Sequence, residues 1–178
     1  MNDILRAQFK KYIESGETLV IADNLTIDDD ELFEVPYLRV RGNLTLKNMF
    51  NLHRIWGLEI AGNLVVESCD LVEMLPRLCT VGKALILKDN TLLKDLGLCP
   101  SCKALEIDSC PSLSILELGI DRCESIIVKH CQNLGTVTQK RMTWVPSKIS
   151  IENCGLVSVP SGLKAGSTFI SNPLAFIC

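Results

Sequence analysis

A short segment that ends in Cys or Asn recurs along this chain at intervals of 20 to 23 residues. Its clearest copies begin at residues 64, 85, 105, 126 and 149, and each has apolar side chains at its first and third positions. Self-similarity at a fixed period is typical of solenoids, whose coils bury their apolar side only against neighbouring coils. We therefore expect an α/β repeat solenoid with a short parallel strand on the concave face and a return segment in each coil, about 7–8 coils of 20–23 residues in all.

The first 16 residues predict a helix that caps this stack. Ile4, Leu5, Phe9 and Ile13 have helical spacing, and the pattern stops at Ser15-Gly16. A first coil without such a cap would expose the open end of its core. We expect a capping helix over residues 1–16 and a solenoid over residues 17–178, which together form one domain.

The return segments are expected to add a second set of buried side chains. Gly42, Gly62 and Gly82 lie between coils, where we expect glycine to let the backbone turn into the next strand. The predicted return-side core consists of Leu71 and Leu75, Leu92 and Leu96, Leu113 and Leu116, Leu134 and Val137, and Leu156 and Val159.

Composition and charge narrow the classes of function. Hydrophobic residues make up 47% of the chain and aromatic residues 5%, so the core is aliphatic. A net charge of −3, with both signs mixed along the chain, disfavours binding to nucleic acid or to an anionic membrane. The N-terminus is too charged for a signal peptide, and no stretch approaches the roughly 18 apolar residues of a membrane span. We therefore expect a soluble protein.

Five cysteine or asparagine residues occupy one repeat position, namely Cys69, Asn90, Cys110, Cys131 and Cys154. Since asparagine can replace cysteine at this position, we expect a small inward side chain that bonds the backbone where each coil leaves its strand. Buried thiols of this kind favour a reducing, cytoplasmic environment over a disulfide-bonded secreted protein.

Four other cysteines recur at the coil period. Cys79 and Cys99 differ by 20 residues and Cys102 and Cys123 by 21, and Cys99 to Cys102 has C-x-x-C spacing. We expect no metal and inert, partly buried thiols, because repeat periodicity by itself produces such spacings. The alternative is a zinc or disulfide site made by two stacked pairs.

Residues 60–76, IAGNLVVESCDLVEMLP, and residues 81–87, VGKALIL, resemble the short bacterial leucine-rich repeats of type III secreted effectors. The resemblance extends over roughly residues 18–177. It implies a leucine-rich repeat fold, ligand recognition and a role in virulence, in the cytoplasm or after secretion into the cytosol of a host cell. Some such effectors also carry a separate ubiquitin-ligase domain with a catalytic cysteine.

Equivalent residues of stacked coils lie about 4.8 Å apart, so each repeat position forms a column on the sheet. Opposite charges in neighbouring coils attract modestly, which would keep the coils in register. One column alternates in sign at every step: Asp28, Lys47, Glu67, Lys88, Asp108, Lys129 and Glu152. We call it the charge column and expect it to leave the face nearly neutral.

A second outward column consists of Thr45, Val65, Ile86, Glu106, Ile127 and Ser150, and we call it the central column. The apolar members Val65, Ile86 and Ile127 predict a strip that docks a protein partner, flanked by the charge column. The alternative is that β-branched residues stand there for strand propensity. An open face of this kind suits a protein better than a small molecule.

Catalysis is not indicated. His53 and His130 lie on different coils, and nothing in the pattern places a carboxylate or nucleophile beside either. We expect a non-enzymatic protein-binding module without a cofactor. Two alternatives stay open. The chain is the recognition domain of a larger enzyme, such as a bacterial ubiquitin ligase whose catalytic domain is absent, or it is a structural module that self-associates end to end through the coil around Phe176 and Ile177.

Overall fold

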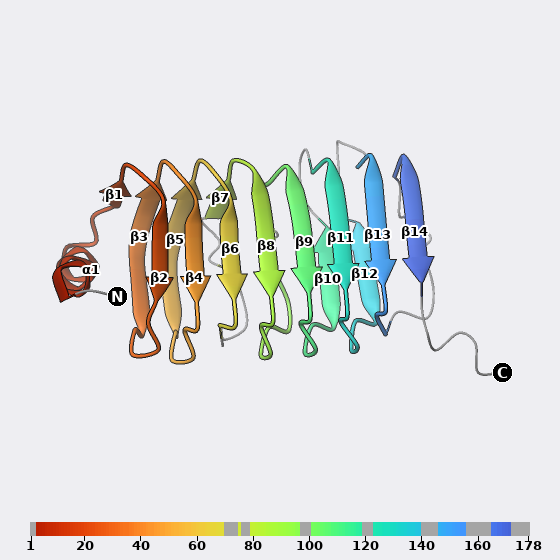
Figure 1. The fold of residues 1–178 in the computed structure, drawn as a ribbon, viewed down its shortest axis with the longest axis horizontal. Helices are drawn as coiled ribbons and strands as arrows, with labels where there is room; N and C mark the ends of the chain where they lie inside the picture. The colour runs from red at the N-terminus through yellow and green to blue at the C-terminus, as the bar shows by residue number, and fades with distance from the viewer. Residues whose placement is uncertain are drawn as a thin grey trace.

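The computed structural model describes residues 3–69, 75, 79–96, 101–118, 123–139, 146–155 and 165–171. In Figure 1 helix α1 lies at one end of a row of strands that stand side by side. Nearly all of the strands are paired in parallel with strands one coil away. The chain therefore winds as a solenoid.

The row in front in Figure 1 is an eight-stranded sheet, which we call the long sheet. Its strands are β2 (Leu25–Asp28), β4 (Leu44–Lys47), β6 (Leu64–Glu67), β8 (Ala84–Lys88), β9 (Ala104–Asp108), β11 (Ser125–Lys129), β13 (Lys148–Glu152) and β14 (Ser167–Ser171). The return segments form two further sheets, which contain β1 (Leu19–Ile21), β3 (Glu34–Val40), β5 (Arg54–Ile60) and β7 (Cys79–Val81) in one, and β10 (Ile115–Leu118) and β12 (Thr136–Gln139) in the other.

The expected repeat solenoid with an N-terminal capping helix is confirmed. It has about six turns, slightly fewer than the predicted 7–8 coils. The long sheet has eight strands, with β2 and β14 at its two edges. The described return segments include strands of their own, which the repeat pattern did not assign.

The core lies between the long sheet and the return strands. Alternation along β4, β6, β8, β9 and β11 buries the first and third repeat positions, as Leu64 and Val66 illustrate, and turns the residue between them outward. On the return side Leu75, Leu96, Leu113, Leu116, Leu134 and Val137 are buried as predicted.

The prediction that Leu92 lies in the core is wrong. Its exposure is 47%, whereas the next residue, Leu93, is 1% exposed. Residues 91 and 92 form a turn, and the chain re-enters the core one residue later than the spacing indicated. Leu71, Leu156 and Val159 lie outside the described residues.

Six strands of the long sheet are followed by a residue in the left-handed backbone region. These residues are Asn48, Ser68, Asp89, Ser109, His130 and Asn153, with φ between 52° and 54°. Asn, Asp and His tolerate this conformation better than β-branched residues do. After each of these six turns the next side chain points inward and is buried.

Glycine and asparagine make the opposite corner of the early coils. The Asn24, Asn43 and Asn63 side-chain oxygens accept hydrogen bonds from the backbone N–H of residues 43, 63 and 84, one coil on, at 2.7–3.1 Å. A Cβ at Gly62 or Gly82 would collide with the backbone of the preceding coil. Glycine is therefore required at these positions because neighbouring coils approach closely. The freedom to turn, which we expected to be the reason, is not what these positions need.

Helix α1 (Asp3–Ser15) covers the end of the first coil. Phe9 is buried, Leu5 and Tyr12 pack against the core, and Gly16 ends the helix with φ of 70°. Ile4, which we expected on the apolar face, is 73% exposed.

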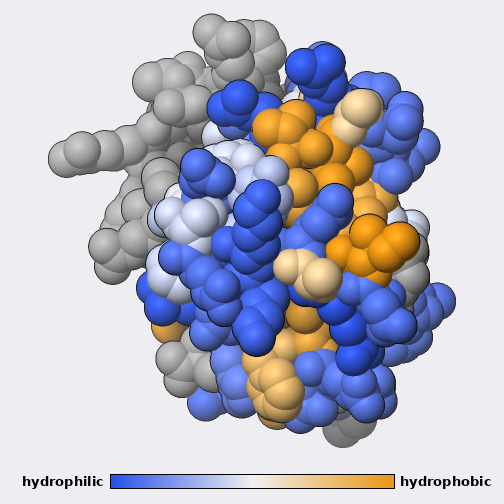
Figure 2. Space-filling view, turned by 90° about the vertical axis from the view of Figure 1, so that its left-hand side faces the viewer, coloured by the Kyte–Doolittle hydropathy of each residue, from blue (hydrophilic) through white to orange (hydrophobic). Residues whose placement is uncertain are grey.

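Arg6 ties this helix to the first coil. Its Nε and Nη2 donate to the two carboxylate oxygens of the buried Asp29 at 2.9 and 2.7 Å, and its Nη1 donates to Glu31 at 2.7 Å. Figure 2 shows this end of the stack as mostly hydrophilic, with a narrower apolar region. Among the described residues, no helix has both the length and the apolar content to cross a bilayer.

The left-handed turns lead to a stability prediction. Replacing Ser68 with Val should lower the free energy of unfolding by about 1–3 kcal/mol, because a β-branched residue is strained at positive φ. Ser68→Gly is the matched control and should leave stability unchanged or slightly higher. Urea unfolding followed by circular dichroism measures both, and equal stability of the two variants would contradict the assigned backbone strain.

Candidate functional site

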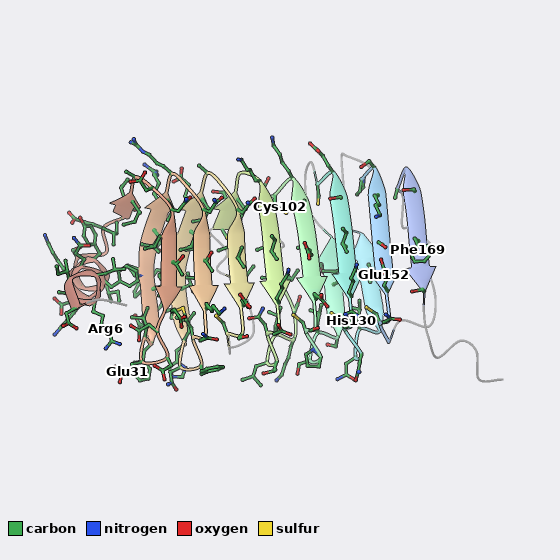
Figure 3. The ribbon with its side chains drawn as sticks, in the orientation of Figure 1. Arg6, Glu31, Cys102, His130, Glu152 and Phe169 are labelled. Carbon is green, nitrogen blue, oxygen red and sulfur yellow. The ribbon has the colours of Figure 1, made fainter. Side chains whose placement is uncertain are left out.

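The central column stands in register on the outward face of the long sheet. Thr45, Val65, Ile86, Glu106, Ile127 and Ser150 are successive Cα partners from β4 to β13. Val65, Ile86 and Ile127 are half-buried, and Ser150 is buried at 1% exposure. Pairing extends the column to Thr26 on β2 and to Phe169 on β14, and Phe169 is 57% exposed. Figure 3 places Phe169 at the end of the sheet farthest from Arg6.

The charge column is also in register, from Asp28 to Glu152. Lys47 Nζ lies 3.6 Å from Glu67 Oε2, and Lys129 Nζ lies 3.7 Å from Glu152 Oε2, so two of the expected cross-coil pairs form. Lys88 instead reaches diagonally to Glu106 of the central column at 3.6 Å. That pair places an ionic contact inside the apolar strip and divides Ile86 from Ile127.

A carboxylate does lie beside His130, contrary to the sequence analysis. His130 Nδ1 is 2.7 Å from Asp108 Oδ1, and Asn153 Nδ2 is 3.4 Å from His130 Nε2. His130 is one of the left-handed residues, so its ring turns back toward the neighbouring coil. Ser109 Oγ donates to the same Asp108 oxygen at 3.1 Å, which leaves the serine bonded to the carboxylate and not to the imidazole. The geometry is that of a surface network and not of a base beside a nucleophile.

This network changes the ionisation of two carboxylates. Partial burial of Asp108 raises its pKa, but hydrogen bonds to His130 and Ser109 outweigh this effect and hold the pKa below its usual range. Ser150 Oγ donates to Glu152 at 2.7 Å, and this bond is the main cause of a lowered pKa of Glu152. Both carboxylates therefore favour the charged form that the charge column requires.

The inward Cys and Asn residues behave as predicted. The thiols of Cys69, Cys110, Cys131 and Cys154 each donate to the carbonyl oxygen two residues earlier, at 3.2–3.5 Å. Asn90 instead bonds the preceding coil with its amide: Nδ2 donates to Val66 O at 2.9 Å, and Oδ1 accepts from Cys69 N at 3.0 Å. All five side chains are buried, so they hold the corner and are not a surface for ligands.

Of the four cysteines in the alternative zinc or disulfide site, Cys79, Cys102 and Cys123 lie among the described residues, and all three are buried. Cys102 and Cys123 are buried and hydrogen-bonded to each other, as stacking of their coils predicted. Burial raises the pKa of the Cys79 thiol to about 12, which favours the protonated thiol at neutral pH. Across the ranges described, no three His, Cys, Asp or Glu side chains converge on a point that could hold a metal ion. Cys99 lies outside them.

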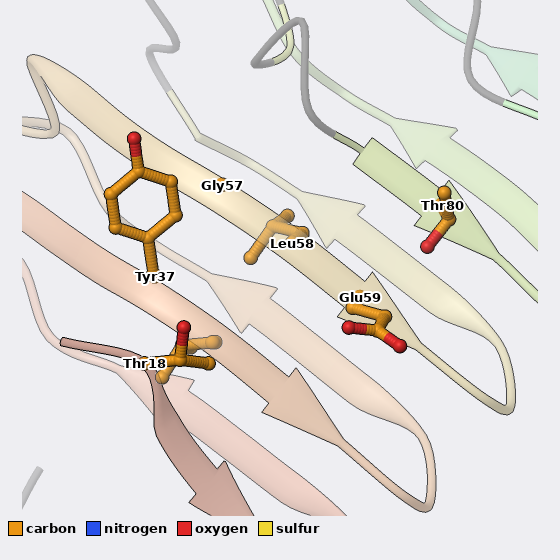
Figure 4. A pocket seen from close by; sticks show the side chains of 7 residues that line it. Thr18, Tyr37, Gly57, Leu58, Glu59 and Thr80 are labelled. Atoms are coloured by element: carbon orange, nitrogen blue, oxygen red, sulfur yellow. The ribbon is translucent and has the colours of Figure 1, made fainter.

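An open pocket of about 340 Å³ lies on the outer face of the return sheet that contains β3 and β5 (Figure 4). Gly57 is the Cα partner of Tyr37, so the strand opposite the tyrosine ring has no side chain to fill the space. Leu58 lines the floor, and Thr18, Glu59 and Thr80 supply polar groups around it. The sequence analysis missed this pocket, although a glycine inside a strand was its available signal.

The acid dependence of stability tests the Asp108 network. The folded-state pKa of Asp108 lies below its unfolded value of about 3.9, so ionised Asp108 stabilises the fold above about pH 4 and this contribution disappears as pH falls through the folded-state pKa. Asp108→Asn should lower the thermal midpoint at neutral pH and show a smaller further loss on acidification than the wild type.

Asp23→Asn, at an exposed position before β2, is the control for removal of a carboxylate. Calorimetry over a series of pH values measures all three proteins. Wild-type and Asp108→Asn curves that stay parallel down to acid pH would contradict the stabilising role of the ionised carboxylate.

Comparison with models of protein families, with curated proteins and with solved structures finds no match to this chain.

Proposed function

We propose that this chain is a non-enzymatic binding module that recognises a protein partner through the outward face of its long sheet. The observation that carries the proposal is the central column, in which Val65 and Ile86 are adjacent and half-exposed on neighbouring strands. Interfaces between proteins combine such an apolar centre with a polar, charged margin. The charge column supplies that margin along one side.

The shape of the face favours a macromolecular ligand. Six strands at about 4.8 Å spacing carry the central column over roughly 24 Å, which matches an extended protein surface better than a small molecule. The side chains stand on paired strands and not on loops, so the face is formed before binding, which limits the entropy lost on association.

Charge sets the kind of partner. Lys47–Glu67 and Lys129–Glu152 neutralise each other across coils, and Lys88 is held by Glu106. The face therefore attracts no strongly charged polymer by its field, and it is suited to a partner with an apolar ridge and a few matching polar groups.

Replacing Val65, Ile86 and Ile127 together with Asp tests this face. Interface centres concentrate the binding energy, so we expect affinity for the partner to fall roughly tenfold or more. The partner is first captured with the wild-type chain as bait in bacterial and in host-cell lysates, and its binding is then measured by calorimetry with purified proteins. Circular dichroism checks that the variant is folded.

The matched control adds three negative charges to the other side of the solenoid, as Val20→Asp, Thr80→Asp and Ser101→Asp. These positions are exposed on the return side. Unchanged binding by the long-sheet variant, or equal loss in the control, would reject the long sheet as the binding face.

A second candidate function is self-association through the edge strand β14, at the end of the long sheet farthest from helix α1 (Figure 1). Phe169 on the edge strand β14 is 57% exposed, and edge strands present backbone groups that can pair with another chain. Phe176 and Ile177, on which the sequence analysis placed this contact, lie outside the described residues.

Light scattering over a range of protein concentrations distinguishes the two candidates. Self-association through β14 predicts a mass that rises with concentration, and Phe169→Asp should return the protein to a monomer, because a buried charge at the contact is unfavourable. Arg39→Asp, far along the stack on β3, is the control. A monomer at every concentration would reject self-association and leave the binding module.

A further inference from the structure

Three thiols stand in one file inside the C-terminal half of the solenoid: Cys110, Cys131 and Cys154. They follow β9, β11 and β13 at the same repeat position, and these strands pair in register. Each thiol donates to the carbonyl oxygen two residues earlier, and the Cys154 thiol also lies 3.9 Å from the carbonyl oxygen of Val128, in the coil that contains Cys131. All three are free and buried.

The spacing of the coils suits a covalent link between neighbours. Parallel strands lie about 4.8 Å apart, within the range of roughly 4.4–6.8 Å between the Cα atoms of natural disulfides. Equivalent residues in register also project their side chains in the same direction. Their Cβ atoms then lie about 4.8 Å apart, so a disulfide between two neighbours requires these atoms to approach each other by roughly 1 Å, to the separation of about 3.8 Å found in natural disulfides.

We propose that this file is a thiol–disulfide site at which peroxide joins Cys131 to Cys154 and so links two successive coils. The Cys154 thiolate attacks an oxygen of hydrogen peroxide, releases hydroxide and becomes a sulfenic acid. The Cys131 thiol then attacks the Cys154 sulfur, the S–S bond forms, and the hydroxyl leaves as water with the Cys131 proton. Two electrons pass from the thiols to the peroxide.

Two observations select Cys154 as the residue that reacts first. It has an exposure of 3%, whereas Cys110 and Cys131 are fully buried at 0%. Hydrogen bonding to Cys131 lowers the pKa of the Cys154 thiol to about 7, which populates the thiolate at neutral pH. The hydrogen bond between Cys131 and Cys110 raises the pKa of Cys131, which suits its role as the second thiol.

The same repeat position supplies an internal control. Cys69 is buried and bonds its own corner carbonyl, but its neighbours in the file are Met49 and Asn90. It shares the burial and the carbonyl bond of the other thiols, and neither of its neighbours in the file is a cysteine. Cys69 should therefore stay reduced under conditions that oxidise Cys131 and Cys154.

The test treats the folded, full-length chain with hydrogen peroxide, blocks the remaining thiols with iodoacetamide and maps the tryptic peptides by mass spectrometry. Cleavage after Lys and Arg puts Cys131 in residues 130–140, Cys154 in 149–164, Cys110 in 104–122 and Cys69 in 55–77. We expect peptide 130–140 linked to 149–164, reversal of the link by dithiothreitol, a raised thermal midpoint for the oxidised protein, and blocked, unlinked Cys69.

Variants make the result decisive. Cys131→Ser should abolish every link in this file, whereas Cys69→Ser should leave the link between Cys131 and Cys154 intact. A chain in which Cys131 joins Cys110, in which the thiols oxidise without linking, or which links only when urea is present would overturn the proposal. Because the wild-type peptide map contains its own control, the test holds even if Cys131→Ser does not fold.

Discussion

The in-register pairing of successive coils is the constraint on which the rest of this structure depends. Each strand of the long sheet pairs residue for residue with its neighbours, from Leu25 opposite Leu44 to Ser150 opposite Phe169. Register converts a position in the repeat into a column in space, so apolar side chains stack in the core and charged ones on the surface. A slip of one residue would turn every buried side chain of a strand outward, which makes this pairing strongly specified.

Two local devices hold the register at the strand ends. A residue in the left-handed region follows six strands of the long sheet, and the next side chain turns inward. The cysteines at this position bond a carbonyl of their own coil, and Asn90 bonds the preceding coil. Asparagine side chains join one coil to the next at the opposite corner of the early coils. The helix completes the stack at one end, where Arg6 binds the buried Asp29. At the strand ends, the same buried side chains thus both pack in the core and hydrogen-bond the backbone.

The sequence predicts features that repeat and misses those that occur once. The solenoid, both outward columns and the inward Cys and Asn position follow from periodicity, because the coils repeat the same evidence. The capping helix occurs once, and its own helical spacing of apolar residues predicts it. The sequence could not show which of Leu92 and Leu93 is buried, since a turn shifts the return segment by one residue. The contact of His130 with Asp108 depends on a left-handed backbone conformation at His130 that the residue type alone does not predict. The pocket beside Tyr37 likewise depends on one unrepeated glycine.

The charge column has a period of two coils, although the fold has a period of one. Lys47, Lys88 and Lys129 are each paired with an acidic residue in both neighbouring coils. Duplication of a single coil would therefore set two like charges side by side, at a small cost in stability, whereas duplication of two adjacent coils preserves the alternation. Growth of such a stack during evolution by pairs of coils is electrostatically neutral, and growth by odd numbers leaves a mismatch that marks the point of insertion.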